Sequence, residues 1–314
     1  MKSKLLGYVF GILAAATYGM NPVFAVPLYE NGMNAESVLL WRYALAIPVV
    51  AIMLIGRGRS LKISRIGDTG ICQLLVQLAI LGVLMGVSSL ALFASYNYMN
   101  AGIASTLLFI YPVMVAVIMA VMFGERMSTL AVFAMLLALG GIMMLYRNPS
   151  GATLSLVGSL LVAVSALTYA IYIVAVNHLA LKEMPTLLLT FYVLIFGTLV
   201  FVASFMTGTT LTVPSGWSQW GFCLGLAVFP TAISFLCTTR SIHIIGSTPT
   251  AVLGAFEPIT AIVLGVVVLH QPISGREWLG AGMILVAVMI TIASVPIGRF
   301  LNRLRHLWPR ISSK

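Results

Sequence analysis

The chain has 314 residues, of which 61% are apolar and only 8% are charged, and its mean hydropathy is +1.08. Because a soluble domain carries about 25% charged residues, this composition excludes a soluble enzyme and a nucleic-acid-binding factor. The net charge of +10 comes from basic residues between apolar runs, so it predicts no nucleic-acid partner.

Ten apolar runs along the chain are long enough to cross a bilayer. A hydrocarbon core of about 30 Å requires about 20 residues of apolar helix, and a helix satisfies its own backbone polar groups in lipid. These runs are too continuous for the alternating strands of a membrane barrel. The sequence therefore predicts an all-α membrane protein with ten transmembrane helices. They lie near residues 5–27, 36–55, 72–96, 101–123, 129–146, 155–178, 187–207, 218–240, 248–268 and 276–296.

The first run follows Lys2 and Lys4 and has the basic start of a secretory signal. Its apolar stretch is longer than a signal core and a similar segment recurs at 155–178, so we interpret it as a retained first helix.

The basic residues predict the orientation of the spans. With the N-terminus in the cytoplasm, all but three of the 17 Lys and Arg residues fall on the cytoplasmic side, as the positive-inside rule requires. We therefore expect a protein of the cell inner membrane whose two termini both lie in the cytoplasm. The tail 297–314 is basic with apolar residues at helical spacing, so it is either an interfacial helix or a segment that only fixes topology.

Trp41 and Arg42 lie near the outer end of the second span. Aromatic and basic residues at that level are first of all interface anchors. The alternative is that they form a gate, with Arg42 attracting a carboxylate.

The chain contains an internal repeat. Residues 107–112 align with residues 253–258 at an offset of 146, which places Tyr111 opposite Glu257. Thr17 and Tyr18 match Thr168 and Tyr169 at an offset of 151. We expect two five-helix halves, 1–148 and 149–296, followed by the tail 297–314. Because five spans is an odd number, the second half is inverted relative to the first, as in secondary transporters that bind solute near the midplane between their halves.

At these positions the sequence resembles the drug/metabolite transporter superfamily of the EamA type. The resemblance covers residues 5–296. The segments that carry it are Ala14–Phe24, Tyr111-Pro112 leading to Gly124-Glu125-Arg126, and Phe256-Glu257-Pro258 leading to Gln271-Pro272. It implies two inverted five-helix repeats, a central cavity, and export of metabolites or amino acids. One departure is His270-Gln271, where the family commonly has Gly-Glu, which puts a symmetric pair of acidic end residues in doubt.

Two sets of polar and aromatic residues face each other across the predicted halves. Tyr18 and Asn21 are three residues apart in the first span, as are Tyr169 and Tyr172 in the sixth, so each pair shares a helix face. With Tyr111 they are candidates to bind a small amphipathic solute. The alternative is that these side chains only satisfy one another between helices.

Pro112 and Pro258 hold equivalent positions in the fourth and ninth spans. A proline inside a helix frees a carbonyl and kinks the chain, so each is either a hinge or a static kink. Six glycines are interpreted as sites of close helix packing: Gly82, Gly86, Gly140, Gly141, Gly280 and Gly282.

Glu257 is the one acidic residue deep inside a span. An ionisable group near the midplane is costly and is a functional candidate by default. It could carry a coupling proton or pair with a solute ammonium. The alternative is a protonated side chain that bonds to a neighbouring helix.

These features together predict a proton-coupled secondary transporter that exports amino acids or related small metabolites by alternating access. A multidrug or organic-cation exporter is the alternative within the class. A membrane enzyme acting on lipid-linked substrates is the alternative outside it, although the chain lacks the convergent acids and histidines that such chemistry uses.

The expected partners are a small-molecule solute, the lipid bilayer and a proton, and association into a homodimer stays open. No cofactor and no metal are predicted, and the three scattered cysteines form no cluster with metal spacing.

Overall fold

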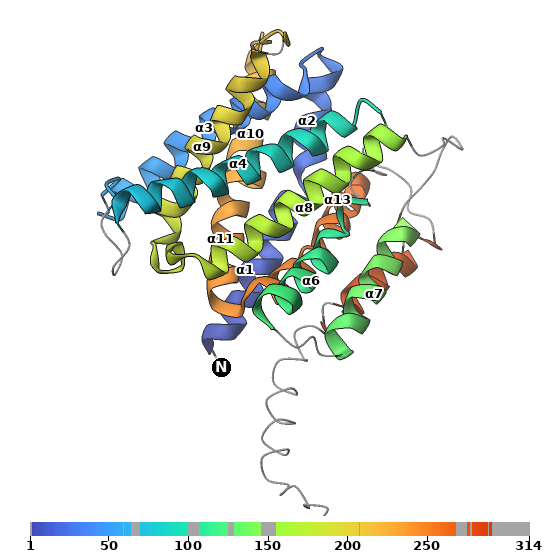
Figure 1. Cartoon of the computed structure of the whole chain (residues 1–314). Coiled ribbons are helices and arrows are strands. Elements are labelled where there is room, and N and C mark those ends of the chain that lie inside the picture. Colours follow the sequence, from blue (N-terminus) through green and yellow to red (C-terminus); the bar gives the residue numbers. More distant parts are fainter. Residues whose placement is uncertain are drawn as a thin grey trace, which may run out of the picture.

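The protein is a bundle of α-helices, shown in Figure 1 as a computed structural model. The structure describes residues 2–58, 60–63, 70–98, 104, 107–124, 129–145, 155–206, 208–267, 275–276, 278–287 and 289–290. These residues contain no β-strand. The tail 297–314, Glu125-Arg126 and His270-Gln271, on which parts of the sequence analysis rest, lie outside them.

Six helical runs are long and apolar enough to cross a membrane, which makes the chain a multi-pass membrane protein. Four of these runs are uninterrupted and match predicted spans. They are α3 (Ala35–Gly56), α4 (Ile71–Ser95), α8 (Leu156–His178) and α9 (Thr186–Phe205). A short 3-10 helix, η1 (Ala180–Glu183), follows α8.

Polar caps begin two of these long helices. Asn34 precedes α3, and its side-chain oxygen accepts a hydrogen bond from the backbone N–H of Ser37 at 2.9 Å. Ser155 precedes α8 and accepts from the N–H of Gly158 at 3.3 Å. Each cap satisfies a backbone donor that the first helical turn leaves free, so both helices begin where a polar residue meets an apolar run.

The first and ninth spans are each broken in the middle by a turn. The first consists of α1 (Lys2–Tyr18) and α2 (Asn21–Glu30), and the ninth of α12 (Ser247–Leu253) and α13 (Phe256–Val267). In both, a proline lies at the second or third residue after the turn, where its missing N–H costs no helical hydrogen bond.

The fourth and eighth spans are interrupted as well. A turn at Phe109 and Ile110 precedes α6 (Tyr111–Phe123), which has Pro112 as its second residue. The eighth span runs from α10 (Trp217–Leu226) through a π-helical segment, η2 (Ala227–Ile233), into α11 (Ser234–Ile245).

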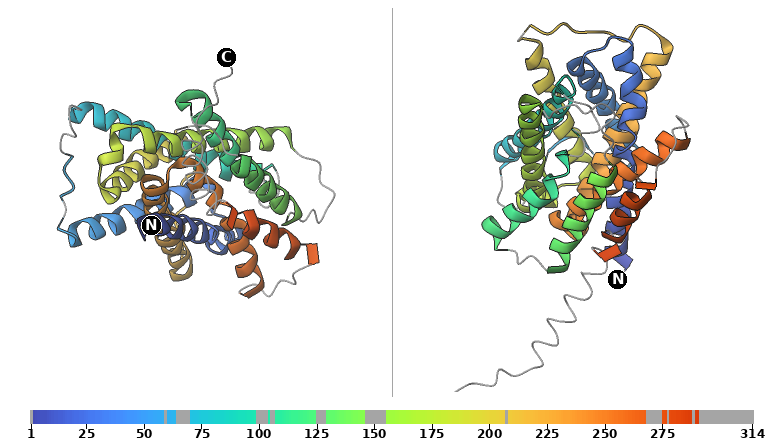
Figure 2. Two further views of the ribbon diagram at one scale, coloured as in Figure 1. Left: turned by 90° about the horizontal axis from the view of Figure 1, so that it is seen from below. Right: turned by 90° about the vertical axis from the view of Figure 1, so that its right-hand side faces the viewer.

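The fifth and tenth spans pair with each other at one side of the bundle. They contain α7 (Thr129–Leu145) and the shorter helix Trp278–Ala287, which lie side by side in Figures 1 and 2. Gly141 makes the contact close, because a Cβ there would meet the backbone of Gly280 and Ile284. Both helices are apolar but shorter than a full span, so the ten-span topology remains a prediction.

The two halves pack in a reciprocal way. The third span contacts the sixth, through α4 and α8, and the eighth span contacts the first, through α11 and α1. The Ser88 hydroxyl donates to the carbonyl of Ser165 at 3.0 Å, and the Ser234 hydroxyl donates to the carbonyl of Ala14 at 3.0 Å. Ser88 and Ser234 are 146 residues apart, and Ala14 and Ser165 are 151 apart. The same hydrogen bond therefore recurs at the two offsets of the internal repeat.

Glycines bring α4 against α9. A Cβ on Gly82 would collide with Phe196 and with the backbone of Gly197 and Val193, and a Cβ on Gly86 would meet the Gly197 carbonyl. Helices in lipid gain their association from such van der Waals packing. The interpretation of Gly82 and Gly86 as close-packing sites is therefore confirmed. For Gly282 the same interpretation is wrong, because a Cβ there would meet no neighbour among the described residues.

Gly82→Ala is expected to lower the free energy of unfolding by about 1–3 kcal/mol, because the added methyl overpacks the contact between α4 and α9. Gly221→Ala is the matched control, since a Cβ at that position in α10 meets no neighbour. Thermal unfolding of the two purified variants in detergent measures the difference. Equal melting temperatures would contradict the packing described.

Candidate functional site

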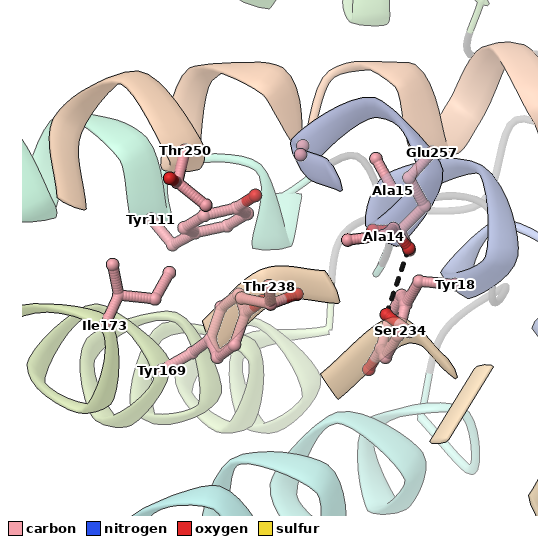
Figure 3. A pocket seen from close by; sticks show the side chains of 12 residues that line it. Ala14, Ala15, Tyr18, Tyr111, Tyr169, Ile173, Ser234, Thr238, Thr250 and Glu257 are labelled. Carbon is pink, nitrogen blue, oxygen red and sulfur yellow. Dashed lines mark hydrogen bonds between the residues drawn. The ribbon is translucent and has the colours of Figure 1, made fainter. Parts of the chain in front are cut away.

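A cavity lies where the broken spans meet. Figure 3 shows its side chains converging from α1, α6, α8, α11 and the two helices of the ninth span. Its lining consists of Gly11, Ala14, Ala15, Tyr18, Tyr111, Tyr169, Ile173, Ser234, Thr238, Thr250, Gly254 and Glu257. The lining includes residues of both predicted halves.

Glu257 is the one carboxylate in this lining. It is the second residue of α13, directly after the turn in the ninth span, and its backbone N–H donates to the carbonyl of Gly254 at 2.9 Å. Gly19, in the turn of the first span, packs on it so closely that a Cβ would collide with the Glu257 carbonyl. The breaks of the first and ninth spans therefore touch at the residue that carries the charge.

Three tyrosines form an aromatic wall. The rings of Tyr111 and Tyr169 meet edge to face with their centroids 4.8 Å apart. The Tyr111 hydroxyl donates to the carbonyl of Ala251 at 3.1 Å and occupies the space that a side chain on Gly254 would fill. Tyr18, the last residue of α1, completes the wall beside Glu257. Aromatic faces and hydroxyl groups together suit an amphipathic molecule.

Two of the predicted solute-binding residues lie behind the wall. Tyr172 is 2% exposed and stacks on Tyr169 with ring centroids 6.2 Å apart. Asn21, the first residue of α2, accepts a hydrogen bond from Arg42. Neither lines the cavity, because the kink of the first span and the packing of α8 turn them toward neighbouring helices.

Hydroxyl side chains of the eighth and ninth spans supply the rest of the polar lining, and the sequence analysis did not identify them. Ser234 and Thr238 are four residues apart on α11, so they share a helix face. One turn further along that face, Ser241 shares a hydrogen bond of 2.9 Å with Thr250 of α12. This spacing of hydroxyl residues was the available signal.

Arg42 is fully buried, so its interpretation as an interface anchor is wrong. It lies seven residues beyond the first residue of α3, about 10 Å along the helix axis. The chain segment that precedes α10 covers this part of α3. The backbone N–H of Thr212 donates to the Ser37 hydroxyl at 2.9 Å, and Asn34 donates to the carbonyl of Thr210 at 2.6 Å.

The guanidinium of Arg42 connects two interrupted spans, the first span at its break and the eighth span at η2. Its Nε donates to Thr231 at 2.5 Å, its Nη1 to Asn21 at 3.1 Å, and its Nη2 to the carbonyl of Pro230 at 3.0 Å. It also lies 5.5 Å from the centre of the Tyr18 ring. Arg42 therefore stands behind the aromatic wall, on the side away from the cavity.

Trp41 packs against α10 and against the segment that precedes α10. Its indole N–H donates to the carbonyl of Thr212 at 3.1 Å, and its ring meets that of Trp220 with centroids 5.1 Å apart. These contacts fasten α3 to α10 and to the segment before it.

The interruptions contain more prolines than the sequence analysis identified. Pro112 and Pro258 each lie in the first turn of a helix, directly after the turn that interrupts the span, and not inside a continuous helix as predicted. Pro230 lies inside η2, and the Thr231 hydroxyl donates to the Leu226 carbonyl at 2.7 Å. Proline cannot donate to the preceding turn, so the side chain of the next residue satisfies that carbonyl.

Potential metal ligands do not gather at this site. Within the part of the chain that the structure describes, no three His, Cys, Asp or Glu side chains are placed to hold a metal ion. The chemistry available to the cavity is that of one carboxylate, several hydroxyls and aromatic faces.

Comparison with known proteins gives the chain relatives over most of its length. It is 24% identical over 301 residues to the uncharacterized transporter YcbK of Bacillus subtilis, covering 90% of this chain and 91% of that protein. It is 26% identical over 197 residues to an uncharacterized transporter of Archaeoglobus fulgidus, covering 63% of this chain and 69% of the relative.

A solved crystal structure shares the fold, with a TM-score of 0.76, 18% identity, and coverage of 96% of this chain and 98% of the other. The EamA-like transporter family matches the chain twice, over residues 5–147 and 156–293. The chain therefore belongs to the EamA-like transporter family and has its all-helical fold of two repeats.

Proposed function

We propose that this transporter is a proton-coupled exporter of amino acids or related small metabolites that works by alternating access. The observation that carries the proposal is the carboxylate of Glu257, which lines a polar and aromatic cavity between broken spans. A carboxylate at that depth can bind the ammonium group of a solute or a proton, but not both at once. Exchange of one for the other couples solute movement to proton movement.

The cavity lining fits a small organic solute. Tyr18, Tyr111 and Tyr169 offer ring faces, and Ser234 and Thr238 offer hydroxyls. Tyr172 and Asn21 act indirectly in this proposal, by holding the wall from behind. An inorganic ion would gain little from aromatic faces, whereas an amphipathic solute uses both kinds of group.

The broken spans supply the movement. Pro112 and Pro258 follow turns in the fourth and ninth spans, and we assign them to the hinges about which the outer parts of these spans tilt. Trp41 joins α3 to α10 and serves in the proposal as part of the outer gate. The two halves, 1–148 and 149–296, exchange roles as the cavity opens to either side.

The placement of the protein follows the positive-inside rule. We propose an inner-membrane protein with both termini in the cytoplasm, because this orientation places all but three of the 17 basic residues on the cytoplasmic side. Under this orientation α1 begins at the cytoplasmic surface.

A second candidate function is export of organic cations. The observation in its favour is that Glu257 is the one charged residue lining the cavity. Aromatic faces beside a carboxylate attract cations. The test between amino acids and organic cations is uptake of both classes into liposomes that contain the purified protein, with and without a pH gradient.

Glu257→Gln is expected to fold and insert but to lose proton-driven transport, with an initial rate lowered by roughly tenfold or more. A charge-assisted hydrogen bond contributes about 1.5–3 kcal/mol, which is about tenfold or more in affinity. Glu183→Gln is the control, since Glu183 is exposed in η1. The readout is solute flux into liposomes at several pH values. Unchanged flux with an unchanged pH profile in Glu257→Gln would remove Glu257 from the mechanism.

Tyr111→Phe keeps the aromatic ring but removes the hydrogen bond to the Ala251 carbonyl. It is expected to lower the free energy of unfolding by about 0.5–1.5 kcal/mol, because the Ala251 carbonyl keeps only its hydrogen bond from the Gly254 N–H. It is expected to leave the pH profile of transport in place. Thermal unfolding measures the change in stability, and liposome flux at several pH values measures the pH profile. Tyr98→Phe, at an exposed position, is the control.

A further inference from the structure

Among the described residues, no carboxylate forms a salt bridge with the buried guanidinium of Arg42. The side chain has 0% exposure, and its three hydrogen bonds go to Thr231, Asn21 and the carbonyl of Pro230, which are all neutral. A guanidinium stays protonated in proteins. A buried charge is costly unless another charge compensates it. Arg42 therefore requires a negative charge nearby that completes its environment.

Glu257 is the candidate for that charge, because Tyr18 lies between it and Arg42. Tyr18 lines the cavity together with Glu257, and the guanidinium of Arg42 lies 5.5 Å from the centre of the Tyr18 ring. Among the described residues, the other titratable groups that line the cavity with Glu257 are the hydroxyls of Tyr18, Tyr111 and Tyr169, which are neutral near pH 7. A basic and an acidic side chain thus lie on opposite sides of Tyr18 in the aromatic wall.

The residues that lie between Arg42 and Glu257 come from one short stretch of the chain, residues 18–21. Tyr18 presents its ring to Arg42 and lines the cavity, Gly19 packs on the carbonyl of Glu257, and Asn21 accepts a hydrogen bond from Arg42. These residues form the break of the first span. The position of this break therefore depends on Arg42 on one side and on Glu257 on the other.

We propose that Arg42 is the fixed counter-charge of Glu257, and that this pair selects solutes with no net charge, such as zwitterionic α-amino acids, over organic cations. The proposal rests on the proposed transport function and narrows its solute class. With Arg42 and ionised Glu257 the empty site is neutral. A zwitterion keeps the site neutral, whereas an organic cation adds an uncompensated positive charge in a region of low dielectric. Arg42 acts through Glu257 and Tyr18 as a positioning and selectivity residue, because it does not itself line the cavity.

The test is a comparison of three charge forms of one side chain. Leucine is a zwitterion, leucinamide a cation and N-acetylleucine an anion, and the same three forms of phenylalanine give a second series. Counterflow of each is measured in liposomes that contain the wild-type protein, Arg42→Gln, Arg42→Lys or the double variant Arg42→Gln/Glu257→Gln. The wild type is expected to prefer both zwitterions. Arg42→Gln leaves Glu257 alone in the site and is expected to shift the ratio of zwitterion to cation flux toward the cation by roughly tenfold or more.

The other two variants separate charge from packing. Arg42→Lys keeps the positive charge and is expected to keep the preference for zwitterions, even where its flux falls because the hydrogen bonds of the guanidinium are lost. The double variant has no charge in the site and is expected to lose the cation preference of Arg42→Gln. An unchanged flux ratio in Arg42→Gln would overturn the counter-charge proposal. Absence of counterflow for all six compounds in the wild type would instead overturn the proposed amino-acid transport.

A stability measurement covers the case in which Arg42→Gln does not fold well enough to transport. Thermal unfolding of the wild type, Arg42→Gln, Glu257→Gln and the double variant Arg42→Gln/Glu257→Gln forms a double-mutant cycle. Since each single substitution leaves one buried charge alone, the two destabilising effects are expected to be less than additive. Additive effects would show that Arg42 and Glu257 do not interact, and the proposal would then be wrong.

Discussion

Backbone polar groups inside a membrane must be satisfied within the protein, and this constraint explains the arrangement around the cavity. Every interruption of a span releases carbonyl groups. The Thr231 hydroxyl satisfies the carbonyl of Leu226, and Arg42 satisfies that of Pro230. The turn in the ninth span closes with the N–H of Glu257 on the Gly254 carbonyl. The breaks are possible because these partners lie beside them, and the same breaks bring polar groups to the cavity.

Internal duplication accounts for the framework but not for the charge. The hydroxyl-to-carbonyl contacts of Ser88 and Ser234 occur at equivalent places in the two halves. Tyr18 and Tyr169, another equivalent pair, both line the cavity. Tyr111 and Glu257 are equivalent in sequence but differ in chemistry, so only the second half places a carboxylate in the lining. The packing of the halves is thus related by the repeat, whereas the electrostatics of the site is not.

The sequence was sufficient for features that depend on local pattern. Apolar runs located the helices, and the repeat brought Tyr18, Tyr111, Tyr169 and Glu257 into consideration together. The burial of Arg42 was not predictable from its neighbours in the chain, because the segment that covers it and two of its partners, Pro230 and Thr231, are more than 160 positions away. The π-helical segment at Pro230 and the inward face of α11 were missed because apolar periodicity does not reveal a register change inside a long run. Tyr172 and Asn21 share a helix face with their partners, yet the kinks decide which of them reaches the cavity.

The two reciprocal seams between the halves differ in one respect. Where α4 meets α8, Ser165 also donates to the carbonyl of Ser88 at 2.7 Å, so two hydroxyls cross that seam in opposite directions. Where α11 meets α1, alanine occupies position 14, so the bond that Ser165 donates has no counterpart there, and the contact between residues 14 and 234 consists of the bond from Ser234. This repeated contact therefore has one such bond in place of two, a difference of about 1 kcal/mol. The duplicated scaffold is therefore asymmetric at this repeated contact, because the seam beside Glu257 has one hydroxyl-to-carbonyl bond where its counterpart has two.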